Sequence, residues 1–375
     1  MDTATWTVKI DIEAIQRANY AWYMARGPKL SDVAKLARVS QGTASNVFNR
    51  PHLVRPEVRE RVEGAARQLG YAGPDPKGRL LRAGKVNAIG IATQERLPHF
   101  FADPYTRGVM EGISEAADAA GAGISLVSAA NDEALAWNIQ SALVDGFVLF
   151  CIEGGERLVR LTRERQLPFV ALALSDDDAT VATIGVDNLA GGRLAAEHLV
   201  SLAHRKFAVL TLPVRANHKE SGPITSQDVE ASVYSTSRDR VRGYFEVLNK
   251  AGIDTSTVPL YETQNDERTV RAALQSIFRD GDPPTALLVQ SDHAALFAID
   301  WLKERGIDVP GDVSVVGFDG IDEAELSDPK LTTIAQPLGE IGRRAVAAIL
   351  KTSPPSRQTL PLELIVRGST AKPRA

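Results

Sequence analysis

Apolar residues recur at helical spacing in short segments near the start of the chain. Within Leu30-Ser-Asp-Val-Ala-Lys-Leu-Ala37 they stand at positions 30, 33, 34 and 37, the i, i+3, i+4, i+7 pattern of an amphipathic helix. Arg38-Val39 then predicts a turn, and Ser40 is a suitable N-cap for a second helix over residues 41–49. The residues expected to face inward in this second helix are Ala44, Val47 and Phe48.

A third helix is expected from Pro56 to Leu69. Proline suits the first position of a helix, and Gly70 suits the position just after its end. Residues 72–85 contain Ala-Gly-Pro-Asp-Pro-Lys-Gly, which breaks regular structure, followed by Arg79-Leu-Leu-Arg82, which is too short to be a stable helix alone. This segment is therefore predicted to be a linker that orders on binding.

From Val86 onward, strand-like apolar runs alternate with helical patterns. Repeated strand–helix units predict parallel sheets covered by helices, and the length fits two such sheets in two lobes. A ligand is expected in the cleft between the lobes, at the carboxyl ends of the strands. The polar segment 215–236 is expected to be a long loop. The expected strands are 86–91, 124–128, 147–151, 169–174, 207–212, 286–290 and 313–318, and the expected helices are 105–120, 132–143, 159–166, 189–202, 241–251, 267–280 and 294–305.

Charge distinguishes the two parts of the chain. The formal net charge is −4, but residues 28–85 contain twelve Lys and Arg against five Asp and Glu, whereas residues 86–375 contain 28 against 39. A small basic module attached to a large acidic one favours nucleic acid as the partner of the first.

The composition is that of an ordinary soluble globular protein, with 44% hydrophobic and 24% charged residues. Cys151 is the single cysteine, so no disulfide or cysteine-based zinc site can form within one chain, and the cytoplasm is the expected compartment. No run approaches the roughly 20 apolar residues that span a bilayer, and the first 27 residues lack the pattern of a secretory signal. We expect no membrane association.

Two helices joined by a tight turn, the second polar on its outer face, describe a helix-turn-helix. The second helix of such a motif lies in the major groove, where Gln or Asn can pair with adenine through two hydrogen bonds. Suitable readers here are Gln41, Thr43, Ser45 and Asn46. On pattern alone, a small surface helical bundle is an equal alternative.

Several longer motifs bear a specific resemblance. The segment from Leu30 to Asn49, with Arg59-Glu-Arg-Val62 and Leu69-Gly-Tyr71, resembles the DNA-binding head of the lac repressor (LacI/GalR) family. The resemblance extends over most of residues 28–370. Its other motifs are Arg79-Leu-Leu-Arg-Ala-Gly84, Val186-Asp-Asn188, Glu197-His-Leu199, Asp312-Val-Ser-Val-Val-Gly-Phe-Asp319 and Leu331-Thr-Thr-Ile-Ala-Gln-Pro337.

The family resemblance implies a small all-α helix-turn-helix head and a two-lobed α/β sensor with parallel sheets, similar to periplasmic binding proteins. The expected divisions are a tail over 1–27, a candidate for disorder, the head over 28–74, a hinge over 75–85 and an effector-binding and dimerisation domain over 86–375. The two lobes are expected at about 86–187 with 337–358, and 188–336 with 359–375.

For DNA, the resemblance implies that Gln41, Gly42 and Asn46 face bases, with Thr43 and Ser45 nearer phosphates, and that Asn49 and Arg79 join this set. Leu81 matches the hinge leucine that relatives insert into the minor groove. Leu80, one position earlier, is the alternative, as is packing of either leucine on the core. The chain departs from the family pattern where Gly42 replaces a larger reader, Asn46 replaces a common Arg, and Arg38 replaces a turn Gly.

For the effector, the resemblance implies a ring-stacking aromatic and a set of polar groups in the cleft, suited to a neutral solute that is hydroxyl-rich or planar. Phe101 instead lying in the core, and Asp319 only capping a turn, are the alternatives. Ser291 replaces a common Asn, and Ala173 stands where many members carry a ligand-binding Asp. The expected effector residues are Phe100, Phe101, Asp103, Arg240, Ser291, Asp292, Asp319 and Gln336.

Enzyme function is disfavoured, because the chain has no phosphate-binding glycine loop of standard spacing and no His-Glu-x-x-His motif. No cofactor, metal or catalytic residue is expected. The sequence therefore predicts a ligand-responsive transcription regulator, more often a repressor in this family. It is expected to bind operator DNA as a homodimer, with a tetramer as the alternative assembly. The competing functions are an activator or dual regulator of the same family, and a solute-binding module without DNA activity.

Overall fold

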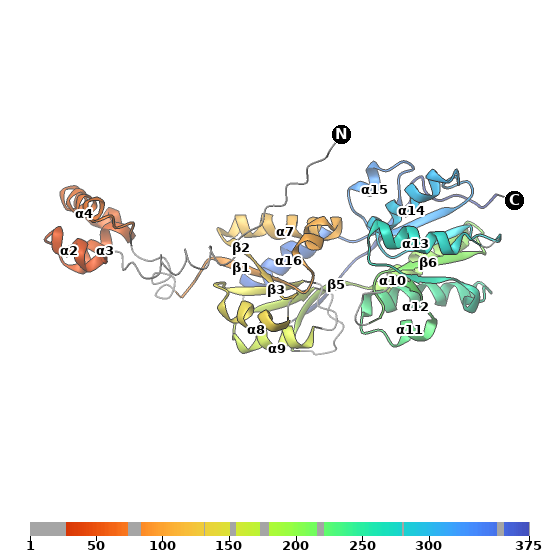
Figure 1. Ribbon diagram of the computed structural model, residues 1–375, viewed down its shortest axis with the longest axis horizontal. Helices are drawn as coiled ribbons and strands as arrows, with labels where there is room; N and C mark the ends of the chain where they lie inside the picture. The colour runs from red at the N-terminus through yellow and green to blue at the C-terminus, as the bar shows by residue number, and fades with distance from the viewer. Residues whose placement is uncertain are drawn as a thin grey trace, which may run out of the picture. The chain divides into compact units, whose positions relative to one another are not determined.

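The computed structural model (Figure 1) describes residues 28–73, 84–130, 132–150, 155–172, 180–215, 221–279, 281–350 and 356–374. The chain forms two compact units, residues 1–86 and 87–375, which we describe separately. The predicted tail, most of the predicted hinge with Arg79 and Leu81, and positions Cys151 and Ala173 lie outside the described residues.

The first unit is a small helical head. Its helices are α2 (Leu30–Leu36), α3 (Gln41–Asn49), the short 3-10 helix η1 (Pro51–Leu53) and α4 (Pro56–Leu69). The Ser40 hydroxyl accepts the Thr43 N–H at 3.0 Å, which caps α3 as predicted, and Gly70 ends α4 at φ 67°. The helices enclose a core of Val33, Ala34, Ala37, Ala44, Val47, Val62, Ala65 and Ala66. The three predicted helices are confirmed.

The second unit has two lobes, each built around one sheet. In the first lobe all strand pairs are parallel, in the order β12-β5-β4-β3-β1-β2. The strands are β1 (Ala88–Thr93), β2 (Gly123–Ser128), β3 (Gly146–Phe150), β4 (Phe169–Leu172), β5 (Ala182–Val186) and β12 (Arg357–Leu360). The helices are α6 (Leu97–Ala102), α7 (Pro104–Ala120), α8 (Asp132–Ser141), α9 (Glu156–Glu164) and α16 (Leu338–Leu350).

The sheet of the second lobe has the order β13-β11-β10-β9-β6-β8-β7, parallel except where the edge strands β13 and β7 pair antiparallel. Its strands are β6 (Phe207–Thr211), β7 (Gly222–Pro223), β8 (Leu260–Glu262), β9 (Ala286–Val289), β10 (Ser314–Asp319), β11 (Thr332–Ala335) and β13 (Glu363–Ile365). Its helices are α10 (Asn188–Ser201), α11 (Ser226–Glu230), α12 (Ser235–Lys250), η2 (Thr255–Thr257), α13 (Glu267–Ile277), α14 (Asp292–Glu304) and α15 (Glu323–Leu326). The alternating strand–helix order confirms the predicted α/β class.

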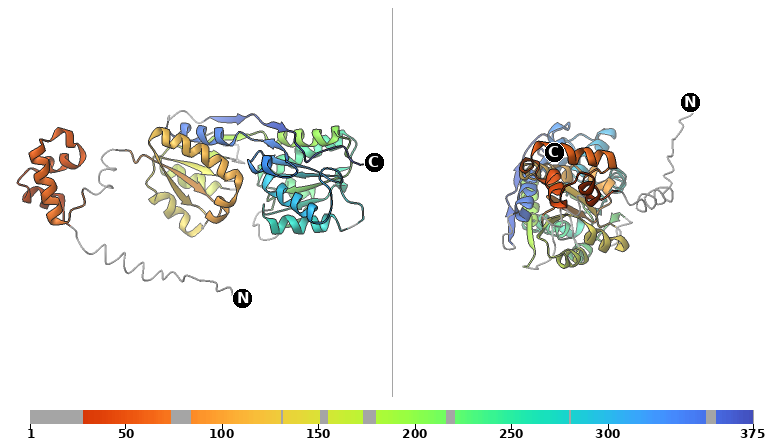
Figure 2. Two further views of the ribbon diagram at one scale, coloured as in Figure 1. Left: turned by 90° about the horizontal axis from the view of Figure 1, so that it is seen from above. Right: turned by 90° about the vertical axis from the view of Figure 1, so that its left-hand side faces the viewer.

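The chain passes between the lobes three times. It does so after β5, after β11 and after β12, which ends in the first sheet at Leu360. Because β5 pairs with β12, and β11 pairs with β13, these connections lie together along one side of the unit (Figure 2). The lobes are thus joined by a narrow connection rather than by a shared sheet.

Each lobe contains a helix pair that approaches closely through glycine. A Cβ added to Gly192 on α10 would lie 2.3 Å from the Arg240 carbonyl oxygen on α12, and one on Gly243 would lie 2.3 Å from the Leu189 oxygen. In the first lobe, Gly342 on α16 has the same relation to the Val109 oxygen on α7, at 2.3 Å. Only glycine permits these backbone contacts, so the helix pairs are fixed in register.

Several elements differ from the sequence-based expectation. The predicted loop 215–236 contains β7, α11 and the start of α12, so that prediction is wrong in part. The first six residues of α12 are all polar. The apolar periodicity of this helix begins only at Val241, and the predicted start was therefore too late. The short strands β5, β8, β11, β12 and β13 gave too little pattern to detect, and α16 was overlooked despite its amphipathic sequence.

None of the helices within the described ranges is long and apolar enough to cross a membrane.

Candidate nucleic-acid interface and ligand cleft

Helix α3 separates a buried side from a polar outer side. Ala44 and Val47 are buried in the head core, and Phe48 packs against it. The predicted base-facing residues Gln41, Gly42, Asn46 and Asn49 are exposed, whereas Thr43 and Ser45 are half-buried. The helix therefore presents a surface of uncharged hydrogen-bonding groups that is free of core contacts.

Local hydrogen bonds order part of this surface. The Ser40 and Thr43 hydroxyls lie 2.8 Å apart, and the Asn49 side-chain amide donates to the Ser45 hydroxyl at 3.1 Å. A Cβ at Gly42 would meet only the Ser40 Oγ, at 3.8 Å, so a larger side chain would fit. The glycine is not required by packing, and it removes a potential reading group from the outer side of α3.

The turn before α3 is strained at Arg38. Its φ is 54°, in the left-handed region, which costs a residue with a Cβ about 1–2 kcal/mol. The positive charge of the head comes from residues outside α3, since α3 contains no Lys or Arg.

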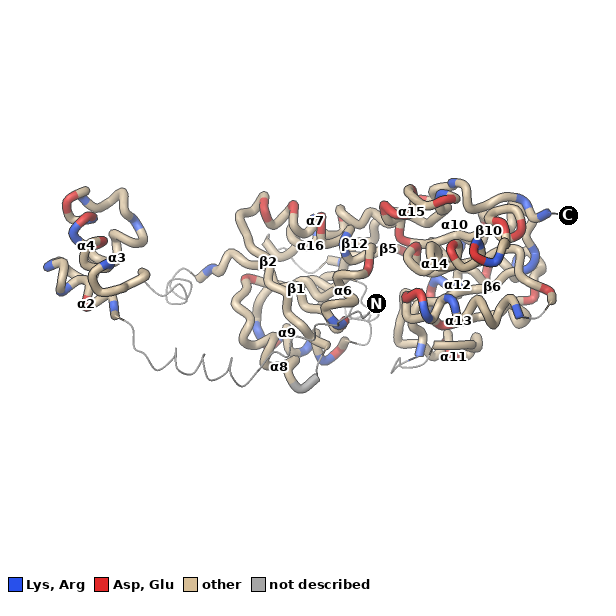
Figure 3. The backbone as a smooth tube through the Cα atoms, turned by 45° about the horizontal axis from the view of Figure 1, so that its top comes forward, with Lys and Arg blue, Asp and Glu red and all other residues tan. Residues whose placement is uncertain are grey.

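In the sensor, acidic positions are numerous around α14 and α15 (Figure 3).

A cavity of about 630 Å³ lies between the two lobes of the sensor. The first lobe contributes the loop from β1 to α7, the end of β5, and β12, while the second contributes the starts of α10 and α12 and the loops after β6, β8, β9 and β11. The lining residues that carry ionisable or amide side chains are Gln94, Glu95, Arg96, His99, Asp103, Tyr105, Asp187, Asn188, Tyr234, Asp239, Arg240, Gln264, Asn265, Asp319, Gln336 and Gln358.

Arg240 is the centre of a buried polar network in the cleft wall. Its Nη1 lies 3.8 Å from Asp319 Oδ1 and donates to the Gln290 carbonyl oxygen, while its Nε donates to Asn188 Oδ1 at 3.0 Å. The guanidinium carbon lies 3.5 Å from the centroid of the Phe318 ring, a cation–π geometry. The cation is therefore held in one orientation before any ligand is present.

Asp319 completes this network in an unusual backbone conformation. Its φ of 124° lies in a region that residues with a Cβ rarely adopt, and its Oδ1 accepts the Gln336 amide at 2.8 Å. Burial raises the pKa of Asp319 well above its ordinary value, although the Arg240 charge acts in the opposite direction. Strain and a perturbed carboxyl group together are typical of a functional site.

Of the eight expected effector residues, five line the cavity: Asp103, Arg240, Ser291, Asp319 and Gln336. Phe100 is fully buried in the core beside Phe150, and Phe101 is 56% exposed; neither lines the cavity. The alternative of a core position thus applies to Phe100 rather than Phe101. No group of three or more His, Cys, Asp or Glu in the described ranges could hold a metal ion.

Asp292 also lies outside the cavity lining. Its carboxylate accepts the N–H groups of Gly320 and Ile321, at 2.7 and 3.0 Å, and the Thr333 hydroxyl at 2.6 Å. Burial raises its pKa to about 6. Asp292 braces the strained turn that carries Asp319, and so acts on the site through its neighbour.

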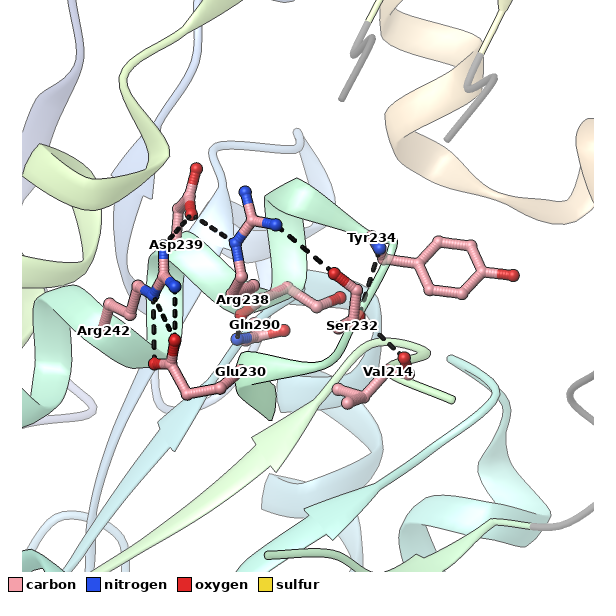
Figure 4. Close-up of polar contacts among 9 residues, drawn as sticks. Val214, Glu230, Ser232, Tyr234, Arg238, Asp239, Arg242 and Gln290 are labelled. Atoms are coloured by element: carbon pink, nitrogen blue, oxygen red, sulfur yellow. Dashed lines mark hydrogen bonds and ion pairs between the residues drawn. The ribbon is translucent and has the colours of Figure 1, made fainter. Parts of the chain in front are cut away.

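The aromatic side chains that do line the cavity are Tyr105 and Tyr234, which the sequence analysis missed. Tyr234 is placed by the segment predicted to be irregular: Ser232 donates to the Val214 carbonyl at 2.7 Å and accepts the Tyr234 N–H at 3.1 Å (Figure 4). Arg238 donates to the Ser232 carbonyl at 3.3 Å. The run Ser-Val-Tyr-Ser-Thr-Ser at residues 232–237, which spans the start of α12, was the available signal, because helix N-termini commonly bind ligands.

Glu95 is another lining residue that sequence patterns did not reveal. Glu95 lines the cavity from the loop after β1. Its side chain is exposed at the cavity surface, but protein surrounds the carboxyl group on several sides. This incomplete hydration, with the Asp103 charge, raises the pKa of Glu95 to about 7.

Comparison with known proteins agrees with this arrangement. The model of the lacI family of bacterial regulatory proteins matches residues 29–73, and that of a periplasmic binding protein-like domain matches residues 196–370. An HTH-type transcriptional regulator of Mycobacterium tuberculosis is 34% identical over 93% of this chain and 98% of its own length. The regulator CelR of Thermobifida fusca is 30% identical over 92% of this chain and 98% of its own length.

Solved structures give the same result. The lac repressor dimer bound to operator and the anti-inducer ONPF matches with a TM-score of 0.70 and 27% identity, covering 92% of this chain and 100% of that one. The complex of CelR with cellobiose matches with a TM-score of 0.65 and 28% identity, covering 91% and 99%.

A helix-turn-helix head joined to a two-lobed ligand-binding domain defines a ligand-responsive, DNA-binding transcription regulator. The chain belongs to the lacI family of bacterial regulatory proteins. Members of this family bind operator DNA and small-molecule effectors, and they are regulators rather than enzymes.

Proposed function

We propose that this protein is a repressor that acts as a homodimer in the cytoplasm. Two heads bind a near-palindromic operator, and an effector in the interlobe cavity changes the affinity of the dimer for DNA. The observation that carries the proposal is the presence, in one chain, of an unobstructed polar face on α3 and a cavity of about 630 Å³ with a preorganised Arg240. Ligand preference for one lobe arrangement shifts the population that is competent for DNA, and this coupling is reciprocal.

On the DNA side, Gln41 and Asn46 are the principal base-reading residues, with Gly42 at the same face. Thr43, Ser45 and Asn49 contact the backbone or support the readers. Arg79 and Leu81 contribute from the hinge. Since Gln and Asn pair best with adenine, A·T pairs are expected at the positions these residues reach.

On the effector side, Arg240, Asp319 and Gln336 form the polar anchor, with Ser291 and Asp103 at the walls. A ring of the ligand stacks on Tyr234 or Tyr105. The relative CelR has been solved with cellobiose, which supports a hydroxyl-rich molecule of similar chemistry.

The test begins with selection of DNA by the full chain from a random duplex library, followed by fluorescence anisotropy on the selected duplex. Gln41→Ala and Asn46→Ala should each weaken specific binding by about 1–3 kcal/mol, and Asn249→Ala, on the sensor surface, should leave it unchanged. Equal DNA affinity of all three variants would contradict the assignment of α3.

The effector site is tested by thermal shift of the full chain against a panel of sugars and nucleosides. Arg240→Met should abolish the stabilisation that a bound compound produces. Arg271→Met is the matched control, because Arg271 pairs with Glu267 and Glu304 on the surface, away from the cavity. If both variants retain the ligand-induced shift, Arg240 is not an anchor.

A further inference from the structure

The first turns of α12 form one wall of the cavity. Its lining residues are Tyr234, Ser235, Thr236, Ser237, Asp239 and Arg240. Buried hydrogen bonds fix the Arg240 side chain, whereas Tyr234 and Asp239 are half-buried and lie nearer to solvent. The contacts that hold these two side chains therefore decide the shape of this wall.

The inner side of the wall is attached to the sheet by Gln290, which is fully buried directly after β9. Its side-chain amide donates to the Ser237 carbonyl oxygen at 2.9 Å, and its Oε1 accepts the Leu212 N–H at 3.0 Å. Salt screens buried groups much less than exposed ones. This inner attachment is therefore expected to be the same at low and at high ionic strength.

The outer side of the wall is held by a chain of charged side chains (Figure 4). Arg238 donates through Nη1 to the Ser232 carbonyl oxygen at 3.3 Å and through Nε to Asp239 Oδ1 at 3.1 Å. The Ser232 hydroxyl in turn accepts the Tyr234 N–H at 3.1 Å. Arg238 thus links the turn that carries Tyr234 to the carboxylate of Asp239.

The chain of contacts continues to α11. Asp239 Oδ1 lies 3.7 Å from Arg242 Nη1, and Arg242 Nε donates to both carboxylate oxygens of Glu230 at 3.0 and 3.2 Å. The hydrogen bonds from Arg242 lower the pKa of Glu230, which keeps Glu230 ionised at neutral pH. Glu230 is the last residue of α11, so this ion pair fixes one end of the turn from which the Tyr234 ring extends away from the charged chain (Figure 4).

Exposure to solvent increases along this chain of contacts toward Glu230. The exposed fraction of the side chain is 25% for Arg238, 32% for Asp239, 41% for Arg242 and 55% for Glu230. The Debye length falls from about 10 Å at 0.1 M salt to about 3 Å at 1 M, so added salt weakens the outermost pair most. The wall therefore has an inner attachment that salt leaves intact and an outer one that salt loosens.

We infer that Glu230 and Arg242 are positioning residues for effector binding. Neither residue lines the cavity, but their ion pair holds Asp239 in place and, through Arg238, the turn that carries Tyr234. The inference rests on the proposed effector cavity and adds a condition that regulates it: the affinity for effector falls as the ionic strength rises, even for an uncharged compound. A role in helix packing alone would change the stability of the protein without this salt dependence.

The first experiment follows the Tyr234 ring in the full chain without any ligand. The seven tyrosines are labelled with 3-fluorotyrosine, and the fluorine resonance of Tyr234 is the one absent from Tyr234→Phe. At about 0.05 M salt, Glu230→Gln should move this resonance toward the position that the wild type shows at about 0.5 M salt. A resonance that does not move contradicts positioning by Glu230.

Glu246→Gln is the matched control. Glu246 lies on α12, pairs with Arg193 on α10 and is 51% exposed, close to the exposure of Glu230, but neither Glu246 nor Arg193 lines the cavity. This variant should leave the Tyr234 resonance in its wild-type position. An equal movement in both variants would overturn the inference, because it would show a general response to a lost surface charge.

The second experiment measures affinity by isothermal titration of the full chain at the same two salt concentrations. The probes are glucose, cellobiose, ribose and adenosine, which are uncharged at neutral pH, so any salt dependence comes from the protein. For a probe that binds, Glu230→Gln should raise Kd about two- to fivefold at low salt, the effect of one exposed ion pair, and should match the wild type at high salt. A difference of the same size at both salt concentrations overturns the ionic mechanism.

A double-mutant cycle with Tyr234→Ala shows whether Glu230 acts through the ring. Once the ring is absent, Glu230→Gln should change the affinity by less than about 1.5-fold, whereas independent roles would give losses that multiply. Losses that multiply would remove the link to Tyr234 while the cavity itself stands. If none of the four probes binds the wild-type chain, the proposed effector cavity fails, and this inference fails with it.

Discussion

Arg107 on α7 of the first lobe forms an ion pair with Glu323 on α15 of the second lobe. Both side chains are close to half-exposed, so the pair contributes little to the stability of the fold. It joins two lobes that the three chain crossings also link. It lies near Asp103, and the charges of Asp103 and Arg107 both act on His293 across the lobes. The pair is therefore placed to favour one arrangement of the lobes over others.

Replacing Arg107 should weaken effector binding without unfolding the protein. We expect Arg107→Ala to lower the affinity for the effector a few-fold through faster dissociation, because the lobe arrangement that encloses the cavity loses a contact, and to change the free energy of unfolding by less than about 1 kcal/mol. Stopped-flow dissociation and denaturant titration measure the two effects. Arg343→Ala is the control, since Arg343 pairs with Glu115 at 3.0 Å within one lobe with similar exposure. An equal change of dissociation rate in both variants would contradict the interlobe role.

Gly192→Ala should damage both stability and ligand binding. The added Cβ would lie 2.3 Å from the Arg240 carbonyl oxygen, so α10 and α12 must separate. We expect the sensor to lose about 2 kcal/mol or more, and the position of Arg240 to change. Calorimetry and effector titration check this. Gly64→Ala, at a position on α4 with no atom within 4 Å of the added Cβ, should instead stabilise the head by about 0.5–1 kcal/mol.

Arg38→Gly should stabilise the head. A residue with a Cβ at φ 54° is strained, and glycine relieves this strain at some cost in unfolded-chain entropy; we expect a net gain of about 0.5–1 kcal/mol. Hydrogen exchange of the α3 amides in the full chain measures this gain in stability, and the exchange should become slower. Arg38→Ala removes the same charge but keeps the Cβ, so slower exchange in this variant as well would show that the charge, not the backbone, is responsible.

Stability of the second lobe should fall between pH 7.5 and 5.5 because of His204. This side chain is buried, and its ring contacts the Thr285 hydroxyl at 2.9 Å and the Ala371 carbonyl at 2.9 Å, tying the C-terminal segment to the lobe. Burial lowers the pKa of His204, so near pH 6.5 and below the unfolded chain binds more protons than the folded one. The contribution is present above about pH 6.5 and is lost as the pH falls below it.

Urea titrations at several pH values measure this slope. His204→Gln should flatten it, whatever its effect on stability at pH 7.5. His52→Gln, at an exposed position in the head, should leave it as in the wild type. A slope that persists in His204→Gln would assign the effect to other groups.

Sequence patterns were sufficient where the physical signal is local. The cap at Ser40, the proline at the start of α4 and the glycine after it act within one turn of helix, so the head could be predicted almost to the residue. The long helices and the central strands of the sensor were similarly detectable, because each repeats its apolar spacing over several residues. The resemblance to a known family then supplied the order of the domains.

What the tertiary structure decided is which side chains meet. Phe100, Phe101 and Asp292 lie beside true lining residues in the sequence, and only packing shows that Phe100 joins the core and Asp292 braces a turn. Glu95, Tyr234, Gln264 and Asn265 come from three separate loops, and no periodicity marks a loop residue that faces a cavity. The sequence by itself determined a head that reads DNA and a sensor with two lobes, since these depend on local helix signals and repeated strand–helix units. The chemistry of the cleft depends on contacts between residues far apart in the chain, and these exist only once the two lobes have folded.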